Sequence, residues 1–337
     1  MAVFSVNIHP VPEGGLSMKA SAQTRPAPIL DMHLHAFRAA DQGPPPVSIC
    51  VPLSIPPAEN GANWGAAFGA FLKNPTCAHP IHSPLTDKEL MDRTLAIMER
   101  RNVIGVASGP LVNEWRKVSG DRIIPGLFFD LGPGAPSAGE MRALFKAGRY
   151  SVLGEVIIQY QGIEPGDAKF EPYLALAEEM DIPVGIHVGP GPPGAPYLGF
   201  QGYRARLHSP LVVEEALLRH PRLRMWLMHA GWPMLDDLLA VLWTHPQLYV
   251  DVGVISFGIP RPVFHRYLRS LVETGFGNRV MFGSDQMVWP EALEVAIQSI
   301  ETATFLTPAQ KRDILYNNAA RFLRLSREQI ARHNGRK

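Results

Sequence analysis

Short apolar segments alternate with longer amphipathic segments along most of the chain. Apolar runs bounded by turn residues predict buried strands, at 29–35, 103–106, 123–129, 152–160, 182–188, 224–230, 248–254 and 280–285. Apolar residues at helical spacing predict helices, at 86–101, 138–149, 171–180, 210–220, 234–245, 261–274, 290–303, 308–323 and 326–334. Thr86 and Thr307 begin capping-box patterns, and Pro308 occupies the first position of its helix.

Apolar strands that alternate with helices are typical of a parallel sheet covered by helices. Eight such units predict an α/β fold, a (β/α)₈ TIM barrel that forms a single domain over residues 29–325. A doubly wound open sheet is the alternative, because the number of strands is hard to determine from one sequence. No strand is followed by a Gly-x-Gly-x-x-Gly loop, which argues against a nucleotide-binding open sheet.

Three segments lie outside the regular alternation. Residues 1–28 are rich in proline and glycine and predict an irregular N-terminal arm, and residues 326–337 predict a C-terminal helix and tail. Residues 41–85 predict a long irregular loop insertion after strand one, of the kind that forms lids and binding loops. Its aromatic residues are candidate pocket walls or part of a subunit interface, together with a later tryptophan: Trp64, Phe68, Phe71 and Trp232.

Composition excludes several classes of partner. The 337 residues are 46% hydrophobic and carry a formal charge of +1, with no basic block, so neither nucleic acid nor an anionic membrane is expected as a partner. No apolar run reaches the roughly 18 residues of a membrane helix, and no signal-peptide pattern begins the chain, so we predict a cytoplasmic protein. Cys50 and Cys77 are the only cysteines and are expected to be free thiols.

Metal-binding residue types follow or end five of the predicted strands. In a parallel barrel the carboxyl ends of the strands meet at one mouth, where the chemistry takes place. His33 and His35, two residues apart, are expected to project from one face of strand one. Strands four, five, six and eight carry one such residue each, in the order Glu155, His187, His229 and Asp285. All six can bind a divalent metal or transfer protons.

Taken singly, each of these residues has a structural explanation. A lone histidine can be a hydrogen-bonded core residue, Asp285 can cap a turn, and Glu155 can pair with an arginine. Their coincidence at five strand ends predicts a site for one or two divalent ions, with zinc expected and manganese or iron as alternatives. Arg38, Arg204 and Arg206 are candidate clamps for a substrate carboxylate, or solvated surface residues. His79 and His82 could reach the site from the insertion.

The chain resembles the amidohydrolase superfamily, in particular its aminocarboxymuconate-semialdehyde decarboxylase-like branch. The resemblance rests on five segments, at 31–35, 182–187, 227–231, 282–285 and 316–321. It implies a metal-dependent barrel in which His33, His35, His187 and Asp285 hold the ion and His229 acts as acid/base. In two-metal relatives a carboxylate or a modified lysine on strand four bridges the ions, whereas many one-metal members of this branch have no ligand there, so the resemblance leaves the role of Glu155 open.

The predicted function is hydrolysis of a small amide, ester or lactone by a water molecule activated at the metal, with His229 and Asp285 as catalytic residues. The predicted metal ligands are His33, His35, Glu155, His187 and Asp285, and the predicted substrate-binding residues are Arg38, Arg204 and Trp232. Non-oxidative decarboxylation of an aromatic or muconate-type acid is the alternative, because it uses an overlapping set of residues. A third possibility is a barrel that binds metal or ligand without turnover. Many relatives are dimers, so a homodimer is possible here.

Overall fold

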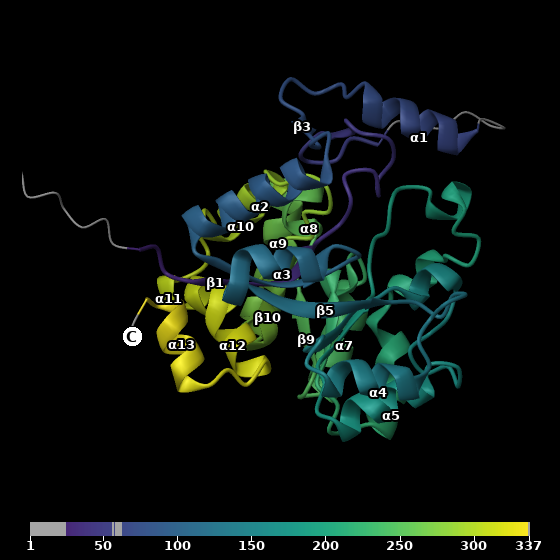
Figure 1. The fold of residues 1–337 in the computed structure, drawn as a ribbon, viewed down its shortest axis with the longest axis vertical. Coiled ribbons are helices and arrows are strands. Elements are labelled where there is room, and N and C mark those ends of the chain that lie inside the picture. Colours follow the sequence, from purple (N-terminus) through teal and green to yellow (C-terminus); the bar gives the residue numbers. More distant parts are fainter. Residues whose placement is uncertain (1–24, 56, 58–62, 336–337) are drawn as a thin grey trace, which may run out of the picture.

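The computed structural model describes residues 25–55, 57 and 63–335 and shows a nearly closed barrel of parallel strands surrounded by helices (Figure 1). Its eight strands are β1 (Ile29–His35), β4 (Val103–Ser108), β5 (Ile123–Phe129), β6 (Val152–Val156), β7 (Val184–His187), β8 (Met225–Met228), β9 (Tyr249–Asp251) and β10 (Val280–Met281). Neighbours in the sheet follow the order of the chain from β1 to β10.

Hydrogen bonds also join β1 to the residues that directly follow β10. The Met32 N–H donates to the Phe282 carbonyl at 2.9 Å, and the Asp285 N–H donates to the His33 carbonyl at 2.6 Å. An open sheet would leave both edges unpaired, whereas here the two ends of the sheet meet. The predicted TIM barrel is therefore confirmed, and the alternative of a doubly wound open sheet is wrong.

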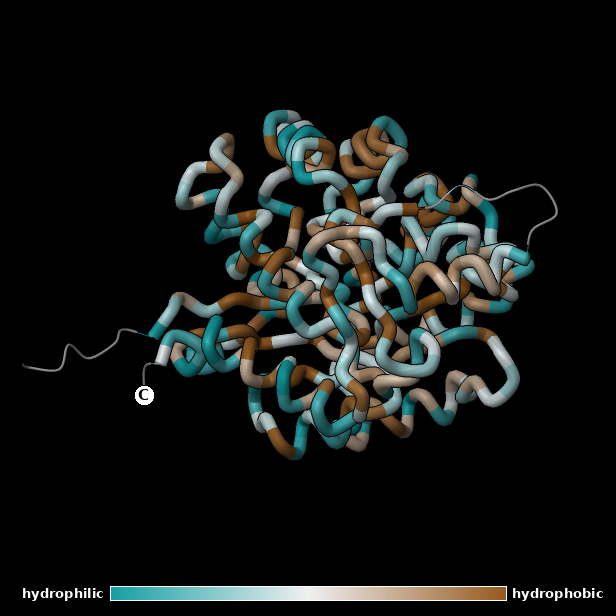
Figure 2. Tube along the Cα trace, turned by 90° about the horizontal axis from the view of Figure 1, so that it is seen from above, coloured by the Kyte–Doolittle hydropathy of each residue, from teal (hydrophilic) through white to brown (hydrophobic). Residues whose placement is uncertain are grey.

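The helices follow the strands in the expected alternation. They are α2 (Asp87–Arg101), α3 (Val112–Ser119), α4 (Ala138–Lys146), α5 (Glu171–Glu179), α6 (Glu214–Arg219), α7 (Leu235–Thr244), α8 (Ile255–Gly258), α9 (Arg261–Glu273), α10 (Ala292–Glu301), α11 (Pro308–Arg312), α12 (Asn318–Phe322) and α13 (Arg327–His333). A π-helical turn, Asp313–Asn317, joins α11 to α12 within the segment predicted as one helix. Sequence patterning missed α3. Figure 2 shows hydrophobic and hydrophilic residues alternating along the outer helices.

Several strands end earlier than predicted. β6 ends at Val156 instead of residue 160, β8 ends at Met228, and β10 ends at Met281 instead of residue 285. Two of the candidate site residues, His229 and Asp285, follow these strands with φ of 63° and 54°. A left-handed backbone conformation cannot continue a strand, so the chain turns out of the sheet at these residues.

The insertion is more regular than predicted. It contains a helix, α1 (Trp64–Lys73), and a small antiparallel pair formed by β2 (Ser48–Ile49) and β3 (Ile81–His82). The prediction of an irregular segment over 41–85 was wrong there, because aromatic residues at positions i, i+4 and i+7 form one face of a helix. The Trp64 and Phe68 rings lie 6.0 Å apart, and the Phe68 and Phe71 rings 6.4 Å apart.

The two cysteines form a disulfide, contrary to the expectation of free thiols. Cys50 and Cys77 lie with Cα atoms 5.8 Å apart, within the range that a disulfide can span. The β2–β3 pairing brings the flanking chain together, since Ile49 is opposite Ile81. The number of cysteines does not reveal that these two lie close together in the fold, and the prediction failed for this reason.

Two further predictions concern the N-terminal arm and the absence of a membrane helix. Of the predicted N-terminal arm, residues 25–28 have no helix or strand, and residues 1–24 lie outside the described part of the chain. Among the helices described, none has both the length and the apolar character needed to cross a membrane.

The floor beneath the barrel mouth is apolar. Trp226 of β8 is fully buried and packs against Phe322 of α12, with ring centroids 5.5 Å apart. A Cβ atom added to Gly185 would lie 2.3 Å from the Trp226 ring, so glycine is required on the neighbouring strand. The indole therefore fills the space below the candidate site and separates it from the opposite end of the barrel.

Candidate metal centre

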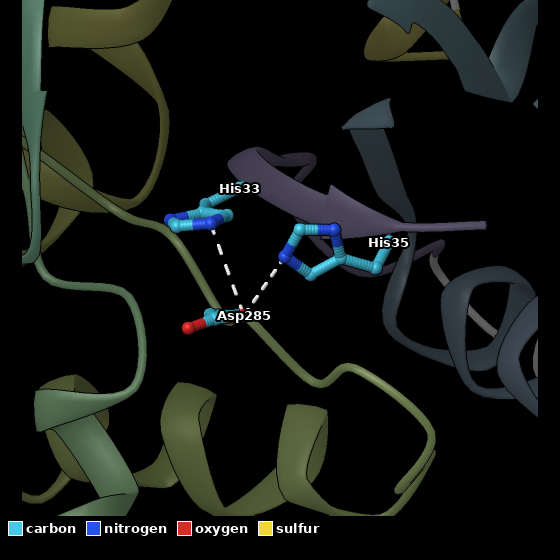
Figure 3. Close-up of side chains that lie close together, drawn as sticks. All are labelled: His33, His35 and Asp285. Atoms are coloured by element: carbon cyan, nitrogen blue, oxygen red, sulfur yellow. Dashed lines mark ion pairs between the residues drawn. The ribbon is translucent and has the colours of Figure 1, made fainter. Parts of the chain in front are cut away.

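Six side chains converge at the carboxyl ends of the barrel strands. All are buried, and the most exposed, Asp285, has only 6% of its surface accessible. They are the residues predicted from the strand ends: His33, His35, Glu155, His187, His229 and Asp285. Figure 3 shows three of them facing one another: His33 and His35 from β1, and Asp285 from the turn after β10.

The first-strand histidines share one carboxylate oxygen. Asp285 Oδ1 lies 2.9 Å from His35 Nε2 and 3.8 Å from His33 Nε2. The two imidazole rings lie with centroids 5.1 Å apart. These three residues form a group whose donor atoms are close enough to hold a metal ion. The predicted convergence of residues separated by about 250 positions is thus present in the fold.

Glu155 lies at the centre of the group. Its Oε1 atom is 3.7 Å from His33 Nε2 and 3.9 Å from both His187 Nε2 and His229 Nε2. Its Oε2 atom is 3.5 Å from His35 Nε2. One carboxylate therefore faces four imidazoles, and it forms a second possible metal-binding group with His33 and His229.

The orientation of His187 is set by Gln159, which sequence reasoning missed. Gln159 Nε2 donates to the Gly189 carbonyl at 3.1 Å, so its Oε1 atom must be the acceptor for His187 Nδ1, 2.8 Å away. The proton of His187 is therefore on Nδ1, and the lone pair of Nε2 faces Glu155. Gln159 belongs to the predicted strand 152–160, where its polar side chain was the available signal.

His229 is oriented in the same way by a backbone group. Its Nδ1 atom lies 3.0 Å from the Gly253 carbonyl, which can only accept a hydrogen bond. Nε2 consequently carries a lone pair, and it is buried without a hydrogen-bond partner among the described residues. Both ring nitrogens of His33 are also buried without such a partner there. Buried polar atoms of this kind are costly unless a ligand or ion satisfies them.

Asp251, at the end of β9, is a further buried carboxylate that sequence reasoning missed. Its Oδ2 atom lies 3.4 Å from His33 Nδ1 and accepts a hydrogen bond from Trp226 Nε1 at 3.0 Å. Its Oδ1 atom accepts from the backbone N–H of Gly253 at 2.8 Å and of His229 at 3.2 Å. Asp251 thus links the floor to the histidines. An acidic residue inside the apolar segment 248–254 was the signal for it.

Two more polar residues hold the backbone of β1. Asp31 Oδ1 accepts from the backbone N–H groups of His33 and Ser284, each at 2.9 Å, and burial raises the pKa of Asp31 to about 7. The Gln286 amide accepts from the His35 N–H at 3.0 Å and donates to the His35 carbonyl at 2.7 Å. These bonds secure the strand that carries the two histidines.

The surroundings of the group favour the ionised form of the Glu155 carboxylate and the neutral form of the His187 imidazole. Burial alone would raise the pKa of Glu155, but positive charge at His33, with hydrogen bonds from His229 and His33, outweighs it and holds that pKa well below its usual range. Burial, reinforced by nearby His229, lowers the pKa of His187 well below its ordinary value. A neutral imidazole and an ionised carboxylate are the forms in which these side chains coordinate a metal.

Comparison with known proteins agrees with this geometry. A family model described as Amidohydrolase matches residues 30–325. The chain belongs to the amidohydrolase family. No curated protein matches this amidohydrolase.

Solved structures similar to this amidohydrolase share its fold. A probable 2-pyrone-4,6-dicarboxylic acid hydrolase from Acinetobacter baumannii, with citric acid bound, matches at 15% identity and TM-score 0.56, over 88% of this chain and 99% of that one. The 5-carboxyvanillate decarboxylase from Sphingomonas paucimobilis matches at 15% identity and TM-score 0.54, over 89% and 100%. An amidohydrolase from Burkholderia multivorans with bound zinc matches at 16% identity and TM-score 0.53, over 89% and 100%.

None of the predicted substrate-binding residues of the amidohydrolase has a polar contact with the six candidate side chains in the described part of the chain. Arg38 is exposed, and the Arg204 guanidinium donates to the Gln201 and Tyr203 carbonyls of its own loop, at 2.7 and 2.8 Å. Trp232 is half-buried against the core. Within the described residues none of the three bonds to the candidate ligands, so their binding roles stay predictions.

Two of the three remaining loop candidates also have local partners. Arg206 lies 3.9 Å from Glu164, and His82 Nδ1 lies 2.7 Å from Ser48 Oγ, while His79 is exposed. The Trp64 indole donates to the Pro193 carbonyl at 2.8 Å, which ties α1 to the loop after β7. The insertion therefore reaches the loop that follows a candidate ligand strand.

Tyr160 is a polar neighbour of the amidohydrolase site that sequence reasoning missed. Its hydroxyl lies 3.3 Å from His187 Nε2, and its ring packs against Phe200 and Tyr203. Burial raises the pKa of Tyr160 well above its ordinary value, so its hydroxyl remains a hydrogen-bond donor. Its place after β6, within the predicted strand 152–160, was the only signal.

Proposed function

We propose that this chain is a metal-dependent hydrolase that cleaves an amide, ester or lactone bond in a small organic substrate. The observation that carries the proposal is the convergence of four imidazoles on the buried carboxylate of Glu155, each within 3.9 Å. Charged and polar groups are rarely buried together without a function or a compensating partner.

The donor set fits a divalent ion. Imidazole nitrogen and carboxylate oxygen are the ligands that zinc, manganese and iron take in proteins. The Nε2 atoms of His33 and His229, which have no hydrogen-bond partner among the described residues, both face Glu155 Oε1, at 3.7 and 3.9 Å. His33, His35, Glu155, His187 and Asp285 are the proposed ligands. When bound, such an ion polarises a carbonyl and lowers the pKa of water to about 7.

The proposed acid/base groups are Asp285 and His229. Asp285 Oδ1 faces the first-strand histidines, whereas its Oδ2 atom lies 3.8 Å from His229 Nδ1. Oδ2 is thus able to take a proton from the attacking water while Oδ1 faces the ligands. The proton that Asp285 takes is then delivered to the leaving group, either directly or through His229, whose Nε2 lone pair can accept it first. The Tyr160 hydroxyl is placed to donate to a substrate oxygen beside His187.

Decarboxylation of an aromatic or muconate-type acid is the second candidate. It is supported by the shared fold with a carboxyvanillate decarboxylase and by the same buried histidines. Glu155 favours hydrolysis, because a carboxylate that faces all four imidazoles would be able to hold a second ion, and a second ion would help to activate water and polarise a carbonyl in the same site.

The test combines metal counting with two activity screens. Purified protein is stripped with a chelator, reloaded with zinc, manganese or iron(II), and counted by mass spectrometry. Proton release is then followed with a panel of lactones and esters, amine release with a panel of amides, and carbon dioxide release with aromatic and unsaturated acids. Metal-dependent release of protons or of amine would support the hydrolase, and metal-dependent carbon dioxide release would replace it with the decarboxylase. Protein that retains no metal, or is inactive in both screens when loaded, would contradict an enzymatic role.

A further inference from the structure

A cleft of about 610 Å³ opens at the end of the barrel opposite the metal centre. It is lined by residues at the starts of strands, including Ile123 of β5 and Val152 of β6, and by residues of α13. The candidate ligands lie at the carboxyl ends of the strands, so this cleft is a separate site. Volumes of about 300–1,000 Å³ are typical of pockets that bind small molecules.

Arginine dominates the polar lining of this cleft. Arg224 pairs with Asp181, with Nε and Oδ1 2.8 Å apart, and that carboxylate also pairs with Arg324 outside the cleft. Four further arginines line the cleft without an ion pair to any carboxylate in the described residues: Arg25, Arg116, Arg122 and Arg332. Asp121 is the one other acidic residue of the lining, so the cleft has an excess of positive charge.

Arg122 is a partly buried cation of this lining. Its Nη1 atom donates to the Val103 carbonyl at 3.3 Å, and the other guanidinium nitrogens have no partner among the described residues. Burial lowers the pKa of Arg122, and the nearby charge of Arg25 lowers it further, while Glu99 acts weakly in the opposite direction. Like charges held together in a half-buried cleft repel one another, and a bound anion relieves that repulsion.

The walls of the cleft are held in place by hydrogen bonds. Asn102 Nδ2 donates to the Pro26 carbonyl at 2.8 Å and to the His333 carbonyl at 3.2 Å, which joins the chain entering β1 to the end of α13. The Tyr316 hydroxyl lies 2.9 Å from His333 Nδ1. Figure 1 shows the chain entering β1 beside α13. The arginines therefore surround a site built from fixed elements.

We propose that this cleft binds a small oxyanion with two or more negative charges, such as a polycarboxylate or a phosphate compound. Guanidinium groups present planar pairs of N–H donors that match carboxylate and phosphate oxygens, and they keep their charge at all physiological pH values. Several guanidinium groups around one cleft favour multiple charges on one ligand. The site does not depend on the proposed hydrolase reaction.

Binding is tested by calorimetric titration of the full chain with citrate and with pyrophosphate, in a buffer free of both anions. The titrations use His33→Ala protein without metal, so that neither anion can be held by an ion at the barrel mouth. We expect binding that weakens as sodium chloride is raised. Stronger binding of citrate would identify a polycarboxylate site, and stronger binding of pyrophosphate a phosphate site.

Arg332→Ala and Arg116→Ala should each weaken the binding about tenfold, the effect of losing one hydrogen bond to a charged group. Arg327→Ala is the matched control, because Arg327 lies on α13 with Arg332 but does not line the cleft. It should change the affinity less than twofold. Absence of binding by both anions, or equal losses for Arg327→Ala and Arg332→Ala, would overturn the proposal. Both arginines of α13 are exposed, so these variants are expected to fold.

Discussion

The two ends of the barrel gather charge in opposite ways. At the mouth, carboxylates and imidazoles are buried within 3.9 Å of one another, and His187 and His229 are each oriented by a hydrogen bond from the second ring nitrogen. At the other end, guanidinium groups surround a half-open cleft and have few acidic partners.

This difference indicates which kind of ligand each end accepts. Nitrogen and oxygen atoms whose lone pairs point into one space can coordinate a cation. Guanidinium N–H groups without acceptors can bind an anion. The proposed ligands at the mouth must also be positioned accurately, because metal–ligand distances vary little. Residues such as Asp251 and Gln159, which contact these side chains from behind, hold them in position. Partly exposed arginines at the other end can adapt through their flexible side chains.

The largest expected effect is loss of metal from His33→Ala. This change removes an imidazole that lies between Asp285 and Glu155, so the metal content should fall to background and activity should fall with it. The loss should exceed the 10- to 100-fold range that is typical of residues behind the ligands. Mass spectrometry of the purified protein measures the metal content. Arg332→Ala, at the opposite end, should leave it unchanged. A His33→Ala protein with normal metal content would contradict the proposed ligand set.

Gly283→Ala is expected to disturb both the fold and the site. A Cβ atom at this position would lie 2.9 Å from His33 Cβ and 3.0 Å from Asp251 Cγ, and neither neighbour is the free end of a flexible side chain. Overpacking of this kind costs about 1–3 kcal/mol of unfolding free energy. Urea denaturation measures the change. Gly139→Ala in α4 is the control, because the nearest atom to its added Cβ is 3.9 Å away. Equal stability of the two variants would show that the mouth is less tightly packed than the distances imply.

Asp251→Asn should weaken metal binding about 10- to 100-fold while the protein stays folded. The amide keeps the shape of the side chain but removes the negative charge beside His33 Nδ1, 3.4 Å away, and replaces one acceptor oxygen by a donor, which costs one of the hydrogen bonds from Trp226 or the backbone. Competition with a fluorescent chelator measures the affinity. Asp236→Asn, an exposed acid at the start of α7, provides the control. If both variants bind metal as tightly as the unaltered protein, Asp251 has no role in positioning His33.

The barrel and its mouth could be predicted from sequence because both follow from short-range patterns. Apolar strands alternate with helices, and residues such as His187 stand at the ends of those strands, where the fold brings them together. The residues that contact the proposed ligands were harder to find. Asp251 and Gln159 are polar residues within apolar segments, but only the three-dimensional arrangement shows which histidine each one contacts.

The insertion could be predicted least well. Cys50 and Cys77 are 27 positions apart in a proline-rich segment, and their pairing depends on how that segment folds. Loop arginines present a similar difficulty, because a long flexible side chain can reach in several directions. Arg204 turns back to carbonyls of its own loop, which residue type and position do not reveal.

The smallest expected effect is that of Arg324→Gln, on the outer side of the basic cleft. Arg324 pairs with Asp181, but both side chains are about half exposed, and Arg224 remains paired with the same carboxylate when Arg324 is replaced. An exposed ion pair contributes about 0–1 kcal/mol, so the unfolding free energy should fall by less than about 1 kcal/mol in urea denaturation. Metal content and anion affinity should both stay unchanged. A loss as large as that of Gly283→Ala would mean that charges at this end of the barrel are packed as critically as those at the mouth, and the contrast between the two ends would fail.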